Sequence, residues 1–234
     1  MKIGQSDGKS FSYLLGVYLG DGCVTHIQGY DRFRLNTIDK DFAEATAKAI
    51  RKLTGKRCKV NGPYKDNRYS QSKPQYMLAS CDADLCRVLK EETDDKQKIP
   101  DWIFEADKDN RLAFIAGLMD SEGFVAENKR NPTNRRFFMG FKSTDPWVLD
   151  FVRLLEKSGI RTGKVRTEKP RKEGYREPTV FNLKMQSWID AGAYFNISRK
   201  QDRVDLWGAC EPYSQRSRNP RRLTPETTRT ARKG

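Results

Sequence analysis

The sequence predicts an α+β protein made of two similar halves, each ordered as helix, two strands, helix, two strands and helix. Three observations support this fold class. An apolar string ending in an acid and a glycine occurs twice, the segments after each copy repeat in the same order, and 36% of the 234 residues are hydrophobic. That hydrophobic share is large enough for a folded core, so a disordered chain is not expected.

The repeated string stands near the start of each half. "LLGVYLGDG" covers residues 14–22 and "IAGLMDSEG" covers residues 115–123. Both strings end in a small residue, an acid and a glycine, so that Asp21 aligns with Glu122, 101 residues later. Two aligned copies in one chain favour a shared role for the two acids over a chance occurrence.

Small residues recur at a four-residue spacing within the helices that we predict at residues 10–20 and 109–121. Residues four apart lie on one face of a helix, and small side chains there let two backbones approach closely. The residues with this spacing are Gly16 and Gly20 in the first copy and Gly117 and Ser121 in the second. The pattern favours a closely packed pair of helices.

The segments after each string also repeat. A strand-like decapeptide starts at Arg32 in the first half and at Arg136 in the second, 104 residues later. A helical pattern that ends near a glycine follows ("FAEATAKAIRKLTG" and "PWVLDFVRLLEKSG"), and basic strand-like segments come next. Each half closes near a lysine, Lys96 or Lys200, again 104 residues apart.

These repeats divide the chain into an N-terminal half at residues 1–105 and a C-terminal half at residues 106–210. The remaining residues, 211–234, are polar, basic and almost free of large apolar side chains. We expect them to form a flexible tail that adds positive charge.

The composition indicates a polyanionic partner. The formal net charge is +14 and the sequence pI is about 9.6, which favours nucleic acid first and an anionic membrane surface second. The sequence contains neither an apolar run near the ~20 residues that span a bilayer nor a basic amphipathic helix with aromatic anchors. The first ten residues lack the apolar core of a signal peptide, so we expect a cytoplasmic location, or an organellar matrix for an organelle-encoded gene.

Cysteine and histidine content disfavours several classes of site. The five cysteines are scattered without a CxxC motif, so neither a zinc site nor a disulfide framework is expected. The single histidine, His26, is too few for a nuclease built on a His general base with several His metal ligands.

Asp21 and Glu122 stand at the ends of the predicted helices, where a carboxylate is electrostatically unfavourable. The last carbonyls of a helix carry partial negative charge, and an exposed acid beside them costs about 0.3–1 kcal/mol. If the two helices pack side by side, two carboxylates and two sets of carbonyls converge. Such a cluster of oxygen atoms suits a hard divalent cation, which can polarise a phosphate and activate a water.

Nine residues of the two strings stand at the positions of a known motif: Leu14, Gly16, Asp21 and Gly22 in the first copy, and Ala116, Gly117, Leu118, Asp120 and Gly123 in the second. With these residues the chain resembles the LAGLIDADG homing endonucleases in their single-chain, two-motif form. The resemblance implies two pseudo-symmetric αββαββα halves joined through two packed motif helices. Each half then lays a curved antiparallel sheet into the major groove of double-stranded DNA.

The resemblance also implies a metal site at the ends of the motif helices. The Asp21 and Glu122 carboxylates would bind Mg²⁺ over the minor groove, two or three ions in the active complex. The backbone carbonyls of Gly20 and Ser121 would add ligands.

Further residues are assigned around this metal site by the resemblance. Lys96 and Lys200 look like the basic residues that orient water or offset phosphate charge. Asp39 and Ser143 occupy the positions of an outer water network, where the two halves differ from each other. Asp120 is expected to pack at the helix end and not to bind metal.

Polar side chains along the predicted strands are candidates for reading bases, since Arg and Lys can bridge guanine and Gln or Asn can bridge adenine. Charged surface positions often touch phosphate only, so we expect about half of the candidates to approach DNA. The candidates in the first half are His26, Gln28, Arg32, Arg34, Asn36, Lys65, Arg68, Tyr69 and Gln71. Those in the second half are Lys129, Arg135, Arg136, Lys142, Arg166, Lys169, Arg171 and Arg176.

The function that the resemblance implies is phosphodiester hydrolysis in double-stranded DNA by an intron-encoded type of homing endonuclease. We expect a staggered cut with short 3′ overhangs and a long, asymmetric target, because the halves are not identical. The chain should act as a monomer, without a protein partner or a membrane. The alternatives of the same fold are an RNA-binding intron maturase and a DNA-binding regulator that does not cleave.

Overall fold

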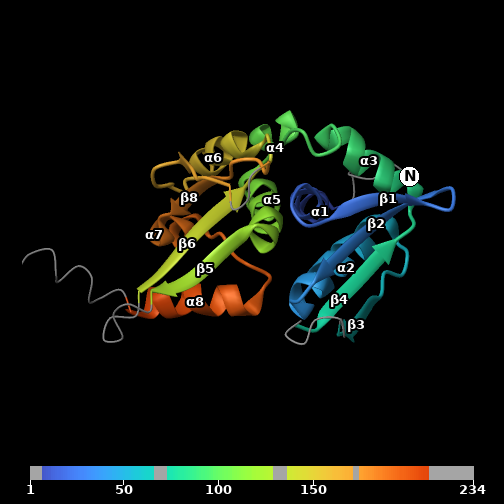
Figure 1. Cartoon of the computed structure of the whole chain (residues 1–234), viewed down its shortest axis with the longest axis horizontal. Helices are drawn as coiled ribbons and strands as arrows, with labels where there is room; N and C mark the ends of the chain where they lie inside the picture. The colour runs from blue at the N-terminus through green and yellow to red at the C-terminus, as the bar shows by residue number, and fades with distance from the viewer. Residues whose placement is uncertain (1–6, 66–72, 129–135, 171–173, 211–234) are drawn as a thin grey trace, which may run out of the picture.

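The computed structural model describes residues 7–65, 73–128, 136–170 and 174–210, and it confirms the α+β class. Figure 1 shows two halves side by side, with helices α1 and α5 adjacent to each other between them. The first half contains α1 (Gly8–Leu19), β1 (Cys23–Ile27), β2 (Tyr30–Thr37), α2 (Lys40–Thr54), β3 (Val60–Tyr64), β4 (Gln75–Ser80), α3 (Ala83–Thr93) and α4 (Asp101–Glu105). The second contains α5 (Lys108–Ser121), β5 (Gly123–Asn128), β6 (Arg136–Ser143), α6 (Val148–Lys157), β7 (Arg166–Thr167), β8 (Thr179–Leu183), α7 (Met185–Ala191) and α8 (Ser198–Cys210).

Each half holds a four-stranded antiparallel sheet with the same strand order. The order is β1-β2-β4-β3 in the first half and β5-β6-β8-β7 in the second. The repeat in the sequence is therefore also a repeat of the fold. Beyond the predicted helix–strand plan, the described chain adds α4 after α3 and α8 after α7.

Helices α1 and α5 touch backbone to backbone, as the spacing of small residues predicts. A Cβ atom added to Gly16 would lie 2.3 Å from the carbonyl oxygen of Phe114. One added to Gly117 would lie 2.2 Å from the carbonyl oxygen of Tyr13. Since any side chain at these two positions would collide with the partner backbone, glycine is required for this close approach.

One face of each sheet is apolar and packs against helices. In β2, the buried Phe33 and Leu35 alternate with Arg34, which points to the opposite side of the sheet. In the second half, the buried Phe141 of β6 packs against Phe151 of α6 at a ring distance of 4.8 Å. The face opposite these buried residues is called the open face below. Its residues include Arg32, Arg34 and Asn36 in the first half, and Phe124, Phe138 and Lys142 in the second.

Two further observations concern the described part of the chain. Within it, no helix combines the length and apolar character needed to cross a membrane. Cys23, Cys58, Cys81 and Cys86 are free thiols. The predicted tail at 211–234 lies outside the described residues.

Candidate active site

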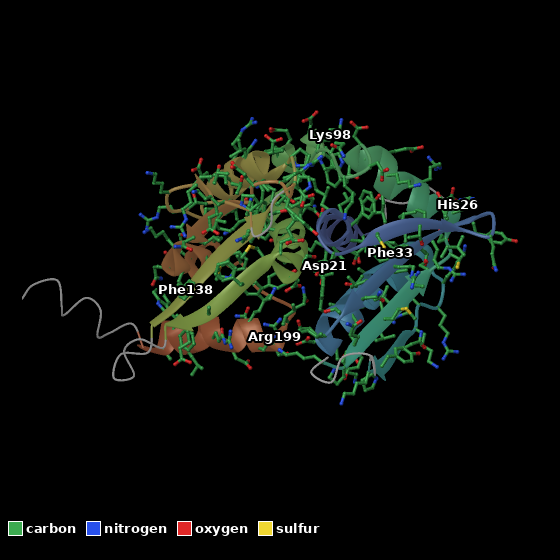
Figure 2. The ribbon with its side chains drawn as sticks, viewed as in Figure 1. Asp21, His26, Phe33, Lys98, Phe138 and Arg199 are labelled. Carbon is green, nitrogen blue, oxygen red and sulfur yellow. The ribbon has the colours of Figure 1, made fainter. Side chains whose placement is uncertain are left out.

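The ends of α1 and α5 bring the two motif acids to one place between the halves. Asp21 follows α1 directly after Gly20, and Glu122 caps the C-terminus of α5. A Cβ on Gly20 would lie 2.3 Å from the Ser121 Cβ and 3.6 Å from the Glu122 Cγ. The two carboxylates and the carbonyls around them therefore converge, as the aligned sequence strings predict. Figure 2 places Asp21 at the junction of the two halves.

The electrostatics of the acids reflect this convergence. The pKa of Glu122 is raised to about 7, first by burial and then by repulsion from Asp21 and Asp145. Burial of the Asp21 carboxylate raises its pKa, although part of the residue stays exposed. The positive charges of Lys200 and Lys96 partly offset this rise. Two acids that repel each other at a helix C-terminus are unfavourable without a counter-charge. A divalent cation would supply that charge.

The protein supplies only some of the oxygen ligands that a hard cation needs, so the site is not a complete cage. Among the residues that the structure describes, no group of three or more His, Cys, Asp or Glu side chains could hold a metal ion. The site offers instead two carboxylates, from Asp21 and Glu122, and the carbonyl oxygens of Gly20 and Ser121. These are all oxygen ligands, which Mg²⁺ prefers, and Mg²⁺ commonly completes its shell with water and substrate phosphate. The residues present therefore fit Mg²⁺ as an ion shared with substrate.

Lys96 reaches the site from a strained turn after α3. Asp94, Asp95 and Lys96 all have positive φ, at 48°, 47° and 72°, a conformation that non-glycine residues adopt at a cost of about 1–3 kcal/mol each. The hydroxyl of Tyr18 donates a hydrogen bond of 2.9 Å to the Asp95 carboxylate, which holds the turn against α1. As a result the Lys96 ammonium donates to the carbonyl of Gly20 at 2.8 Å and that of Gly22 at 3.0 Å.

Lys200 approaches the same region from the first turn of α8. Its ammonium donates to the carbonyls of Met119 and Asp120 at 2.8 and 2.7 Å. The residue is 3% exposed, and burial lowers its pKa to about 8. Lys96 therefore donates to the Gly20 carbonyl, which the resemblance assigns to metal. Lys200 donates to the two carbonyls that precede Ser121.

Asp120 is a buried anchor, in keeping with the packing role expected for it. Its carboxylate accepts hydrogen bonds from the Tyr13 hydroxyl at 3.1 Å and from the backbone and side-chain nitrogens of Asn196 at 3.0 Å each. Burial raises its pKa to about 6. These bonds tie the segment before α8 to α5 and α1, so Asp120 fixes the place from which Lys200 reaches the site.

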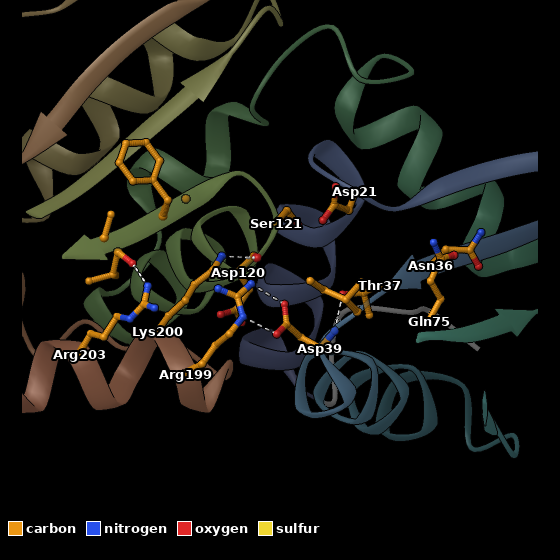
Figure 3. Close-up of a pocket in the computed structure, with 15 residues that line it drawn as sticks. Asp21, Asn36, Thr37, Asp39, Gln75, Asp120, Ser121, Arg199, Lys200 and Arg203 are labelled. Atoms are coloured by element: carbon orange, nitrogen blue, oxygen red, sulfur yellow. Dashed lines mark hydrogen bonds and ion pairs between the residues drawn. The ribbon is translucent and has the colours of Figure 1, made fainter. Parts of the chain in front are cut away.

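A hollow of about 600 Å³ lies beside Asp21 and is shown in Figure 3. Asp39 lines it and accepts two hydrogen bonds from the Arg199 guanidinium, at 2.6 and 2.7 Å. Asp39 stands at the position assigned to an outer water network, but its carboxylate is paired with arginine. Arg199 is not among the residues predicted from the sequence, although it directly precedes Lys200 in "SRKQDR".

A second hollow, of about 470 Å³, lies beside Glu122. Ser143 is buried there, and its hydroxyl donates to the carboxylate of Asp145. Asp145 also raises the pKa of Glu122 by repulsion. Asp145 is also not among the residues predicted from the sequence. The signal for it is its alignment with Asp41, 104 residues earlier in the repeat. The surroundings of the two acids are thus unequal.

The structure separates the candidate DNA-reading residues by face. Arg32, Arg34 and Asn36 share the open face of the first sheet, since they alternate with buried residues in β2. His26 differs, because it pairs in register with Asp31 on the face of Phe33. Its ring bonds the Asp31 carboxylate at 2.8 Å, with Lys90 of α3 on the same carboxylate.

The remaining candidates lie mostly at strand ends and loops. Gln28 is in the β1–β2 turn with φ 52°, and Lys65 follows β3. In the second half, Lys142 and Arg166 both form ion pairs with Glu168. Lys169 and Arg176 are exposed, and Arg176 lines the hollow beside Glu122. Arg68, Tyr69, Gln71, Lys129, Arg135 and Arg171 lie outside the described residues, and Arg136 is described only as the first backbone position of β6.

Comparison with known proteins relates part of the chain to a protein family and to a curated protein. Residues 109–205 match the family model of the LAGLIDADG-like domain. The ribonucleoside-diphosphate reductase NrdEB subunit alpha of Bacillus subtilis (strain 168) is 25% identical over 143 residues, as is the subunit of the same name in Bacillus phage SPbeta. The match covers 55% of this chain and 12% of each subunit, so the chain spans about an eighth of the length of these relatives.

Solved structures resemble the chain over most of its length. The homing endonuclease I-WcaI bound to its DNA recognition sequence has a TM-score of 0.57 at 9% identity, covering 84% of this chain and 87% of that one. I-DmoI in complex with DNA and Mn has a TM-score of 0.52 at 18% identity, covering 78% and 93%. I-SmaMI bound to an uncleaved DNA target with calcium has a TM-score of 0.52 at 10% identity, covering 92% and 94%. At these identities the likeness establishes a shared fold.

Proposed function

We propose that this chain, which has the two-domain LAGLIDADG fold and a LAGLIDADG-like domain at residues 109–205, is a site-specific endonuclease of double-stranded DNA. The observation that carries the proposal is the convergence of Asp21 and Glu122 at the junction of two similar halves. A net charge of +14 favours a polyanionic substrate. Similar structures include proteins bound to DNA, with Mn or calcium in two of them.

The residues around the acids have distinct parts in the proposed hydrolysis. Asp21 and Glu122 would hold Mg²⁺, two or three ions, together with carbonyls of Gly20 and Ser121. A metal held by these residues would polarise the scissile phosphate and make a bound water more acidic. Lys96, which already lies among these oxygens, offsets the charge that develops on the phosphate.

Several finer properties belong to the same proposal. The unequal halves favour a long, asymmetric target, and acids facing each other across the minor groove favour a staggered cut with short 3′ overhangs. Because one chain contains both acids, it acts as a monomer without a protein partner. We further propose an intron-encoded type of enzyme that works in the cytoplasm, or in an organellar matrix.

The two strands should be cut at unequal rates. Asp21 lies beside an Asp39–Arg199 pair, whereas Glu122 lies beside Ser143 and Asp145. These groups would order water differently on the two sides. A nicked intermediate should therefore accumulate on supercoiled target plasmid, with the same strand broken first in most molecules.

The proposal is tested with purified chain, Mg²⁺ and a plasmid library that carries randomised inserts. Cut plasmids are captured at their ends and sequenced, and Asp21→Asn and Glu122→Gln are run as matched variants. Cutting of a defined sequence by the parent, with loss in both variants, supports the enzyme. Specific binding without cutting by the parent supports the regulator or the maturase, which RNA splicing assays then separate. Absence of specific DNA binding overturns the proposal.

A further inference from the structure

We propose that an apolar patch on the open face of β5 and β6 recognises thymine methyl groups in the major groove. The patch, called the Phe patch below, consists of Phe124, Ala126, Phe138 and Gly140. The inference rests on the proposed function, because it takes the open face as the side that enters the groove. It adds a base preference to one half of the target.

The side chains of the Phe patch pack against one another. Phe124 pairs in register with Gly140, and Ala126 with Phe138, so all four lie on one face. The rings of Phe124 and Phe138 meet edge to face, with centroids 5.9 Å apart and planes at 80°. The Phe124 ring lies across Gly140, since a Cβ there would come within 2.4 Å of its Cζ.

The Phe patch is not part of the hydrophobic core. Its strand neighbours Val125 and Met139 point to the opposite face and are buried, whereas Phe138 is 44% exposed. The core of this half is filled from that opposite face by residues such as Phe141. Phe124 lies on the edge strand β5 and the exposed Phe138 on the adjoining β6. Apolar surface left open to water there is costly, which indicates that a partner covers it.

The surroundings of the Phe patch favour DNA as that partner. Lys142 and Arg166 occupy the same open face of the second sheet. In the first half the open face carries Arg34 and Asn36 at the positions that align with Phe138 and Gly140. An apolar patch beside Lys142 and Arg166, two cations that share the single carboxylate of Glu168, suits a polyanion that displays an apolar group. Thymine is the base that displays one, a methyl, in the major groove.

The register predicts where in the target the thymines stand. Phe124 lies two residues beyond Glu122 in the chain, and the Ala126–Phe138 pair lies four residues beyond it. At about 3.3 Å per strand residue and about 3.4 Å per base pair, these are about two and four base pairs from the acid. The preference falls in the half-site bound by the second sheet.

The test removes the methyl group alone. Duplexes enriched from a random library by the full chain are resynthesised with deoxyuridine in place of each thymine, which keeps Watson–Crick pairing. Dissociation constants are measured at one fixed salt concentration. Burial of one methyl contributes ~0.8 kcal/mol, so loss of a contacted methyl should weaken binding about fourfold.

Matched variants separate the Phe patch from general DNA affinity. Phe138→Ala should weaken binding to the thymine duplex and abolish its advantage over the deoxyuridine duplex, while Phe138→Leu keeps part of that advantage. Lys142→Ala should weaken both duplexes equally and keep their ratio. Thermal unfolding of each variant confirms that it is folded.

Three results would overturn the inference while leaving the endonuclease proposal intact. They are enriched sites without thymine at these positions, equal affinity of the parent for both duplexes, and an unchanged ratio in Phe138→Ala. Failure to enrich any DNA sequence counts against the proposed function itself, and the inference falls with it. Equal affinity for the thymine DNA duplex and for an RNA duplex of the same sequence, which lacks the methyl group, also contradicts the inference.

Discussion

Replacing Glu122 with glutamine should stabilise the metal-free chain at alkaline pH, although it removes a residue of the proposed active site. The pKa of this carboxyl is raised from an ordinary value of 4.5 to about 7 by burial and by Asp21 and Asp145. Between these two values the unfolded chain has already lost the proton that the folded chain retains. Stability therefore falls as pH rises through this window, and the loss is complete above about pH 7.

The size of the effect follows from the shift. One pKa unit corresponds to about 1.4 kcal/mol, so ionisation of Glu122 lowers the free energy of unfolding by at most about 3 kcal/mol. Partial exposure of the carboxylate reduces this loss to about 1–2 kcal/mol. For a protein of this size we expect Glu122→Gln to raise the melting temperature by about 2–8 °C at pH 8. At pH 4.5 the difference should nearly vanish, because Glu122 is protonated in the folded state.

The assay is thermal and urea unfolding in EDTA at pH 8 and pH 4.5, with Glu156→Gln on the exposed side of α6 as the control. Addition of Mg²⁺ should raise the melting temperature of the parent and leave Glu122→Gln nearly unchanged, because only the parent keeps both acids. A variant less stable than the parent at pH 8, or one with the same advantage at both pH values, would refute the reasoning.

Three other substitutions test the architecture of the site. Gly117→Ala places a Cβ against the Tyr13 carbonyl and should lower the free energy of unfolding by about 1–3 kcal/mol, measured by urea unfolding. Asp120→Ala leaves the Asn196 nitrogens and the Tyr13 hydroxyl without their acceptor and should cost about 2–3 kcal/mol in the same measurement; an unchanged midpoint contradicts the anchoring role. Lys200→Met should slow cleavage by about 10²–10³-fold with DNA affinity kept, as followed by single-turnover cleavage and gel shift, and unaltered cleavage would remove Lys200 from the site.

The features that sequence could predict are those encoded by local spacing and then duplicated. The four-residue spacing of small residues predicts the contact of α1 with α5, and the second copy places Glu122 opposite Asp21. Both depend on residues within a single helix and its terminus. The α+β class and the succession of helices and strands along the chain follow from the same repetition.

The features that sequence could not predict depend on contacts between distant segments or on strand register. Asp39 and Arg199 meet across 160 positions of chain, and no local pattern records that pairing. His26 has the polarity of a base-reading residue, yet its register opposite Asp31 turns it to the helix side of the sheet. A shift of one residue reverses every side chain of a strand, so polarity alone cannot assign the face.

The glycine contact between α1 and α5 also limits how such a molecule can change over time. Because α1 and α5 meet here through main-chain atoms, no side chain can be exchanged to change their packing. The angle between the two sheets is therefore fixed by peptide geometry. New targets can then be acquired by exchanging side chains on the sheets, while the span between the two half-sites stays constant. The sequence that is recognised can therefore change while the arrangement of the two halves stays the same.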